Sequence, residues 1–167
     1  MERFAPRKKI RLEEYSYSQD GVYFVTICAA DRTPIFGRIE DNHPGFTPAV
    51  RLNSIGEIVL ANIQKIPIVY PCISVDKYVI MPNHIHLLLK ITNSVLQREP
   101  KRDKMLLSKC IQSFKASVSR TLSGQVGSVW QSRYYDHIVR NDADYKRIWK
   151  YIDDNPARWG EDDYYVK

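Results

Sequence analysis

The segment from residue 72 to residue 91 constrains the fold of this chain more than any other part of the sequence. Two runs of mostly β-branched and other apolar side chains, 72–80 and 84–91, are separated by Met81-Pro82-Asn83. Such runs are typical of strands, and proline and asparagine are typical of turns. A connection of three residues joins antiparallel strands, because parallel neighbours need a much longer crossover. The segment therefore predicts an antiparallel hairpin.

Strand-like and helix-like segments alternate around this hairpin. In chain order they are a strand at 21–28, a turn-rich hairpin or excursion at 31–48, a helix at 54–65 that Pro67 stops, a helix at 103–122, a strand at 132–140 and a helix from Asn141 or Asp142 to Asp154. This order predicts an α+β fold whose antiparallel or mixed sheet is covered by helices on one face. The closest simple match is a ferredoxin-like sandwich.

The length and charge of the chain narrow its class. A chain of 167 residues fits one domain spanning 1–167, and its basic start at 1–14 is predicted to be a loosely held arm. Lys and Arg number 25 against 19 Asp and Glu, a net charge of +6 that favours a polyanionic partner. No apolar run is long enough to cross a bilayer and no leader is visible, so we expect a cytoplasmic protein without membrane contact. Cys28, Cys72 and Cys110 form no CxxC pair and are predicted to be reduced core residues.

Two histidines of the hairpin form the first candidate site. Side chains alternate along a strand, so His84 and His86 share the face opposite to Ile85 and Leu87, roughly 7 Å apart along the backbone. Two imidazoles placed in this way can bind one metal ion, and the further ligands must then come from elsewhere in the chain. A pair of half-exposed histidines on a sheet surface is the alternative. A structural zinc site is not indicated, because no cysteine lies close in sequence.

The last predicted helix carries the second candidate site. An apolar stripe at helical spacing predicts its core face, and Tyr151 lies at the edge of that stripe. Asn155 follows Tyr151 at i+4 on the same side. A tyrosine beside a metal can attack a phosphodiester and form a phosphotyrosine while the metal polarises the phosphate. The alternative is a border tyrosine followed by a helix stop before Pro156.

Together these segments resemble a known family. MPNHIHLLLK, VWQSRYYDHIVRN and YIDDNPARWG are similar to motifs of the REP-associated tyrosine transposases, which belong to the one-tyrosine HUH (His, hydrophobic, His) single-strand transposases. The matching stretches are 72–91 and 129–160, and the strand at 21–28 and the helix at 103–122 fit the layout more loosely. The resemblance implies a ferredoxin-like core with the histidines on a central strand and the tyrosine on a C-terminal helix.

The resemblance also implies a chemistry for individual residues. His84 and His86 match the HUH metal ligands, Tyr151 matches the nucleophile, and Asn155 takes the place of a third polar ligand. The implied ion is Mg²⁺ or Mn²⁺. The implied reaction is cleavage of single-stranded DNA to a 5′-phosphotyrosine and a free 3′-OH, with rejoining as the reverse step. His137 matches a recurrent position, which we interpret as supporting the site or contacting DNA.

DNA hairpins with single-stranded flanks are the implied partner. Such partners need phosphate contacts and stacking surfaces. The cations around the predicted site that we expect to contact DNA are Arg133, Arg140, Lys146, Arg147 and Lys150. Basic residues of the helix at 103–122 fit either a DNA surface or a solvated face, and Glu161-Asp162-Asp163 is an unfavourable DNA surface. The resemblance implies a bacterial, nucleoid-associated protein that acts as a monomer or a homodimer, and both oligomeric states stay open.

Three alternatives accompany this interpretation. Tyr134 and Tyr135 are rival nucleophiles, although adjacent strand residues cannot both face the histidines and neither has a polar partner at helical spacing. An inactive relative could bind DNA hairpins without cutting them. A single-strand RNA-binding sandwich would expect exposed aromatic residues on the central strands, where this chain has histidine and leucine.

Overall fold

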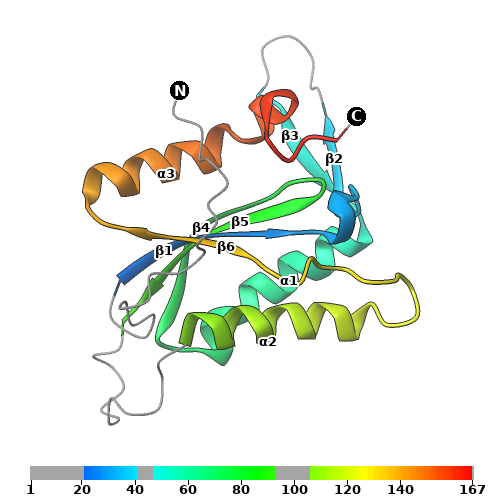
Figure 1. Ribbon diagram of the computed structural model, residues 1–167, viewed down its shortest axis with the longest axis horizontal. Coiled ribbons are helices and arrows are strands. Elements are labelled where there is room, and N and C mark those ends of the chain that lie inside the picture. The colour runs from blue at the N-terminus through cyan, green and yellow to red at the C-terminus, as the bar shows by residue number, and fades with distance from the viewer. Residues whose placement is uncertain (1–20, 41–46, 93–105, 167) are drawn as a thin grey trace.

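The computed structural model describes residues 21–40, 47–92 and 106–166. Its main sheet has four antiparallel strands in the order β4-β5-β1-β6. The strands are β1 (Gly21–Cys28), β4 (Ile73–Ile80), β5 (His84–Ile91) and β6 (Tyr135–Val139). Helices α1 (Ser54–Val69) and α2 (Leu106–Thr121) cover one face of the sheet, and α3 (Asp142–Asp154) lies over the other (Figure 1). This is the predicted ferredoxin-like α+β arrangement, with Tyr151 on the C-terminal helix.

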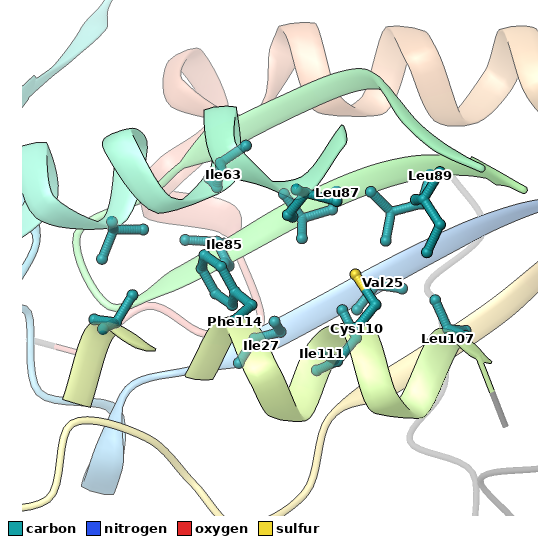
Figure 2. Packing of buried hydrophobic residues seen from close by; sticks show 14 of the residues in the cluster. Val25, Ile27, Ile63, Ile85, Leu87, Leu89, Leu107, Cys110, Ile111 and Phe114 are labelled. Atoms are coloured by element: carbon teal, nitrogen blue, oxygen red, sulfur yellow. The ribbon is translucent and has the colours of Figure 1, made fainter. Parts of the chain in front are cut away.

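The larger hydrophobic core lies between the sheet and helices α1 and α2. Side chains of β5 and β1 that point to this face meet the apolar stripe of α2 (Figure 2). Ile85, Leu87 and Leu89 are completely buried there, as their alternation along the strand predicts. Cys28, Cys72 and Cys110 are buried and none of them is in a disulfide, in agreement with the sequence. None of the described helices combines the length and the apolar composition needed to span a membrane.

A smaller cluster fixes α3 to the opposite face. Phe24 of β1 and Leu88 of β5 pack against Ile148 and Ile152 of α3. Asn141 caps the start of this helix, because its side chain accepts a hydrogen bond of 2.9 Å from the backbone N–H of Asp144. This small cluster places Tyr151 above the central strands of the sheet.

Two shorter segments complete the described fold. The predicted excursion contains a separate hairpin of β2 (Gly37–Glu40) and β3 (Ala49–Leu52). After α3 the chain forms a 3-10 helix, η3 (Pro156–Glu161), which lies close to β3. The chain continues from η3 back toward the first residue of β5, where the backbone carbonyl of Tyr164 accepts a hydrogen bond from the side chain of Asn83.

Two predicted boundaries are wrong. Helix α1 does not stop at Pro67 but continues to Val69, because a proline in the last turn removes only one backbone hydrogen bond. The last strand begins at Tyr135 rather than at residue 132. The preceding chain is held elsewhere, since Lys115 donates hydrogen bonds to the backbone carbonyls of Gln131 and Ser132. The predicted arm at 1–14 and the predicted start of the helix at 103 lie outside the described residues.

Candidate active site

The two histidines of β5 converge beneath α3. His84 and His86 are 0% and 1% exposed, which rules out the alternative of two half-exposed surface histidines. Their Nε2 atoms lie 3.1 Å apart. Strand β5 is central in the sheet, with β4 on one side and β1 on the other. These neighbouring strands and the overlying α3 exclude solvent from the two histidines. The predicted shared face is therefore an enclosed site.

Hydrogen bonds at the Nδ1 atoms orient both rings. Asn83 Oδ1 lies 2.9 Å from His84 Nδ1, and the Asn83 amide donates to the backbone carbonyls of Arg32 (2.9 Å) and Tyr164 (2.7 Å). These two donations fix the amide, so Oδ1 accepts a hydrogen bond from the His84 Nδ1–H, which leaves a lone pair on His84 Nε2. Thr26 Oγ1 lies 2.8 Å from His86 Nδ1 and holds the orientation of that ring. Such bonds at the distal nitrogen are typical of metal-binding histidines.

Tyr151 reaches the histidine pair from α3. Its hydroxyl lies 3.4 Å from His86 Nε2. Its ring packs edge-on against Phe24, with a centroid distance of 5.9 Å and an interplanar angle of 86°. The ring is thus held by packing, which leaves the hydroxyl as the group that faces the histidines.

The rival tyrosines lie differently. Tyr134 points to the α2 side, where its hydroxyl lies 2.8 Å from Ser108 Oγ. Tyr135 is on the α3 side and packs edge-on against Phe24 at a centroid distance of 6.5 Å. The structure therefore brings Tyr151 to the histidines and separates Tyr134 from them by the sheet.

Asn155 and Asp162 form the third part of the site. Asn155 Nδ2 donates to Asp162 Oδ2 over 3.1 Å, whereas Asn155 Oδ1 is buried without a hydrogen-bond partner among the described residues. Asp162 Oδ2 lies 3.8 Å from His84 Nε2, and its side chain is 3% exposed. The sequence placed Asp162 in an acidic surface patch, and this is wrong, because the chain after η3 turns back over β5.

The returning chain also covers the histidines with aromatic rings. Tyr164 and Trp159 lie against His84, with centroid distances of 4.6 Å and 5.9 Å. Arg32 fixes this segment, because its guanidinium lies over the Tyr164 ring and donates to the backbone carbonyl of Asp163 over 3.2 Å. Nothing in the periodicity of the sequence indicated these contacts.

Several oxygen and nitrogen acceptors face one another at this point. One ligand atom each from His84, His86 and Asp162 lies within 4.8 Å of the others. The unpartnered Oδ1 of Asn155 is a further buried oxygen of the same site. Imidazole nitrogens together with carboxylate and amide oxygens suit Mn²⁺ well and Mg²⁺ more weakly. The residues present therefore fit a divalent cation.

Sequence relatives cover nearly the whole chain. A Haemophilus influenzae protein described only as uncharacterized is 32% identical over 174 residues, which cover 96% of this chain and 93% of the relative. A second H. influenzae protein, provisionally named a REP-associated tyrosine transposase, is 26% identical over 151 residues, or 86% of this chain and 74% of the relative. The chain is thus similar in sequence to a protein named after the REP-associated tyrosine transposases. No family model matches it.

Two solved structures have folds similar to the fold of this chain. A REP-associated tyrosine transposase bound to a REP hairpin superposes with a TM-score of 0.60 at 20% identity, over 90% of this chain and 75% of that one. A protein of Deinococcus radiodurans R1, provisionally described as a transposase, has a TM-score of 0.50 at 14% identity, over 86% of this chain and 97% of that one. These likenesses confirm the fold class expected from the sequence.

The buried site alters the protonation of its groups. Burial lowers the pKa of His86 to about 3. Burial and the neighbouring His86 hold the pKa of His84 well below its usual range. Burial, with the nearby Asp162 carboxylate, raises the pKa of Tyr151. At neutral pH the imidazoles are therefore neutral, which is the form that binds metals, and the phenol keeps its proton.

The predicted DNA-contacting cations lie on the surface of the protein. The exposed side chains are those of Arg133, Arg140, Lys146, Arg147 and Lys150. Arg147 and Lys150 form ion pairs within α3, with Asp144 and Asp154 respectively. All but Arg133 lie on α3 or at the end of β6 next to it, on the same side of the sheet as the histidines.

His137 supports α3 rather than the histidine pair. Its Nε2 lies 2.8 Å from Asp144 Oδ2, in the first turn of α3. It also lines a surface depression together with Arg140, Asn141, Ala143, Asp144 and Arg147. The structure thus places His137 where it joins β6 to the helix that carries Tyr151.

Proposed function

We propose that this protein is a metal-dependent enzyme that nicks and rejoins single-stranded DNA through a covalent bond to Tyr151. The observation that carries the proposal is the position of the Tyr151 hydroxyl, 3.4 Å from His86 Nε2, which itself lies 3.1 Å from His84 Nε2. The tyrosine oxygen is a nucleophile, and the buried pair of ligand nitrogens is a cation site. The two are close enough for one phosphate group to contact both. Similarity to a protein provisionally named a REP-associated tyrosine transposase supports the same chemistry.

The reaction exchanges one phosphodiester for another. The Tyr151 oxygen attacks phosphorus and forms a bond to the 5′-phosphate of the downstream strand. The bond between phosphorus and the 3′ oxygen of the upstream strand breaks, and that oxygen leaves as a 3′-OH. The proton lost by the phenol is balanced by the proton that the 3′ oxygen gains. Since the number of phosphodiester bonds is unchanged, the reverse attack rejoins strands without a nucleotide cofactor.

The protein supplies alignment for this step. His84, His86 and the oxygens of Asp162 or Asn155 would hold a Mg²⁺ or Mn²⁺ ion, which when bound polarises the phosphate and stabilises the developing negative charge. Phe24 fixes the plane of the Tyr151 ring, and Thr26 and Asn83 fix the two imidazoles. Burial raises the pKa of Tyr151, so the phenol keeps its proton at neutral pH.

DNA hairpins with single-stranded flanks are the proposed substrate. The related transposase structure contains a REP hairpin. Exposed arginines and lysines of this chain lie on α3 beside Tyr151, where they can contact phosphates. A single-strand RNA-binding sandwich is less compatible with the structure, because helices cover both faces of the described sheet and leave no open platform for bases (Figure 1).

A labelled hairpin with single-stranded flanks tests the proposal directly. With Mn²⁺ present, wild-type protein should transfer a 3′-end label into a protein adduct on a denaturing gel, and a 5′-end label should appear in a shortened strand. Tyr151→Phe keeps the ring packing and should abolish the adduct while leaving hairpin affinity nearly unchanged. Tyr135→Phe, on the same side of the sheet, is the matched control and should keep the adduct.

Two outcomes would contradict this assignment. A Tyr151→Phe protein that still forms the adduct, together with a Tyr135→Phe protein that does not, would move the nucleophile to Tyr135. A wild-type protein that binds the hairpin but forms no adduct in Mn²⁺ would indicate DNA binding alone. Metal dependence is checked in the same assay, since chelator or the double substitution His84→Ala and His86→Ala should stop cleavage.

A further inference from the structure

Asp162 occupies the position of a metal ligand that the sequence motifs do not include. Its Oδ2 lies 3.8 Å from His84 Nε2, and one atom from each of His84, His86 and Asp162 lies within 4.8 Å of the other two. We propose that Asp162 is a direct ligand of the divalent cation, so that the site is formed by two histidines and one carboxylate. This rests on the proposed function, because it concerns the ion that the proposed function requires.

Both oxygens of Asp162 are oriented by the protein. Oδ1 accepts a hydrogen bond of 2.8 Å from the backbone N–H of Tyr164, and Oδ2 accepts one of 3.1 Å from Asn155 Nδ2. Each carboxylate oxygen has two lone-pair sites, so Oδ2 keeps one site that can face His84. Oriented carboxylates of this kind are what a metal site needs from its surrounding groups.

The charge of Asp162 lacks a close cationic side chain in the described part of the chain. Arg32 is near, but its Nη1 donates to the backbone carbonyl of Asp163 and its guanidinium lies over Tyr164. His84 Nε2, at 3.8 Å, is beyond hydrogen-bond distance. A carboxylate that is 3% exposed is costly unless it is paired or bound to a metal. A divalent cation between Asp162 and the two histidines would satisfy this requirement.

Asn155 then has a different role from the one expected from the sequence. It is a positioning residue, because its Nδ2 holds the Asp162 carboxylate toward His84. Its Oδ1 is buried without a partner among the described residues, so it can add a second oxygen but does not replace the carboxylate. A carboxylate contributes charge as well as a lone pair, and this favours tighter cation binding than an amide alone.

Mn²⁺ affinity, measured by the EPR signal of the free ion, tests the proposal without DNA. Asp162→Asn keeps the shape and should weaken Mn²⁺ binding by at least about tenfold. Asp163→Asn is the matched control, because it removes the same charge from the next, exposed residue, and it should bind Mn²⁺ like wild type. Asn155→Ala should weaken binding no more than Asp162→Asn does.

A wild-type measurement keeps the proposal falsifiable if Asp162→Asn does not fold. An anomalous-difference map of a crystal containing Mn²⁺ should place the ion about 2.0–2.3 Å from an Asp162 oxygen. Mn²⁺ affinity of Asp162→Asn within twofold of wild type, or an ion more than about 3 Å from both Asp162 oxygens, would overturn the proposal and leave the proposed function standing. A wild-type protein that binds no Mn²⁺ would instead count against both.

Discussion

The orientation of the histidine side chains depends on hydrogen bonds at the ring atoms that point away from the proposed cation. Thr26 and Asn83 bind the Nδ1 atoms of His86 and His84 and so hold both rings with Nε2 toward the site. Thr26 pairs directly with His86 across β1 and β5, and it is 2% exposed. Its hydroxyl is therefore a buried group with a function in the site.

Thr26→Val should uncouple His86 from β1. The substitution keeps the shape and removes the hydroxyl, which leaves His86 Nδ1 buried without this partner. We expect the free energy of unfolding to fall by about 1–3 kcal/mol in urea denaturation. We expect Mn²⁺ affinity to fall by about 10- to 100-fold, because the ring loses the hydrogen bond that holds its orientation. Thr121→Val, which removes an exposed hydroxyl that binds the Ser117 carbonyl in α2, is the control and should change neither value much. Unchanged Mn²⁺ affinity in Thr26→Val would show that Thr26 does not orient His86.

The sequence predicted the site residues that lie in regular strands and helices. It missed the site residues in the segment that follows η3 and returns to β5. His84 and His86 follow from strand alternation, and the nearness of Asn155 to Tyr151 follows from helical spacing. Asp162 and Tyr164 reach the site only because η3 reverses the chain and Asn83 binds the Tyr164 carbonyl. No periodicity encodes a reversal of this kind, so Asp162 resembled a surface acid.

At the scale of elements, α3 is fixed less firmly than α1 or α2. Among the described residues its fully buried contacts with the sheet come down to Phe24, Leu88, Ile148 and Ile152, whereas α1 and α2 share the main core. Lys77 adds an ion pair with Asp153 at the end of the helix. Because local opening follows local burial, α3 should open at a lower free energy than the rest of the fold. The stability of α3 determines how firmly the Tyr151 hydroxyl is held at the histidines.

Ile148→Ala should loosen α3 selectively. Ile148 is completely buried, and removal of such a side chain costs about 2–5 kcal/mol of packing. By hydrogen–deuterium exchange we expect α3 amides to exchange at least about tenfold faster, while β5 and α2 amides change much less. Val118→Ala, at a completely buried position of α2 on the other face, is the control and should not single out α3. Equal acceleration of α3 and β5 in Ile148→Ala would mean that the helix opens only when the whole domain unfolds.

The predicted bounds of the elements are correct where a hydrophobic pattern ends at a capping or helix-stopping residue. The strands at 21–28 and 84–91 and the helix at 142–154 have the predicted bounds, the helix because Asn141 is its cap and Asn155-Pro156 follows. The two errors have different causes. Helix α1 continues past Pro67 because a proline in the last turn removes only one backbone hydrogen bond, and the Tyr70 N–H still donates to the Ile66 carbonyl. The connection before β6 is held by Lys115 of α2, and local propensity does not encode a contact between different elements of this kind.

For the whole molecule, the sheet divides two surfaces with different roles. The histidines, Tyr151 and the cations of α3 share one side. Helices α1 and α2 close the other side (Figure 1). Basic residues of α2 therefore face away from the site, and Lys115 is used to hold the carbonyls of Gln131 and Ser132. The net charge of +6 favours DNA over the whole surface, but productive binding requires phosphates on the α3 side.

Removing one positive charge from each side of the sheet should separate the contribution of the α3 surface to DNA binding from that of the general positive charge. Lys146 is exposed on α3, and Lys65 is exposed on α1 on the far side of the sheet. Lys146→Gln should weaken binding of a hairpin with single-stranded flanks and reduce the slope of log affinity against log salt by about 0.7–0.9, because one phosphate contact and its released counterion are lost. Lys65→Gln removes the same charge and should leave both the affinity and the slope nearly unchanged. Fluorescence anisotropy over a series of NaCl concentrations measures both. If the two substitutions reduce the slope equally, the hairpin is bound by the general positive charge of the protein and not by the surface that carries Tyr151.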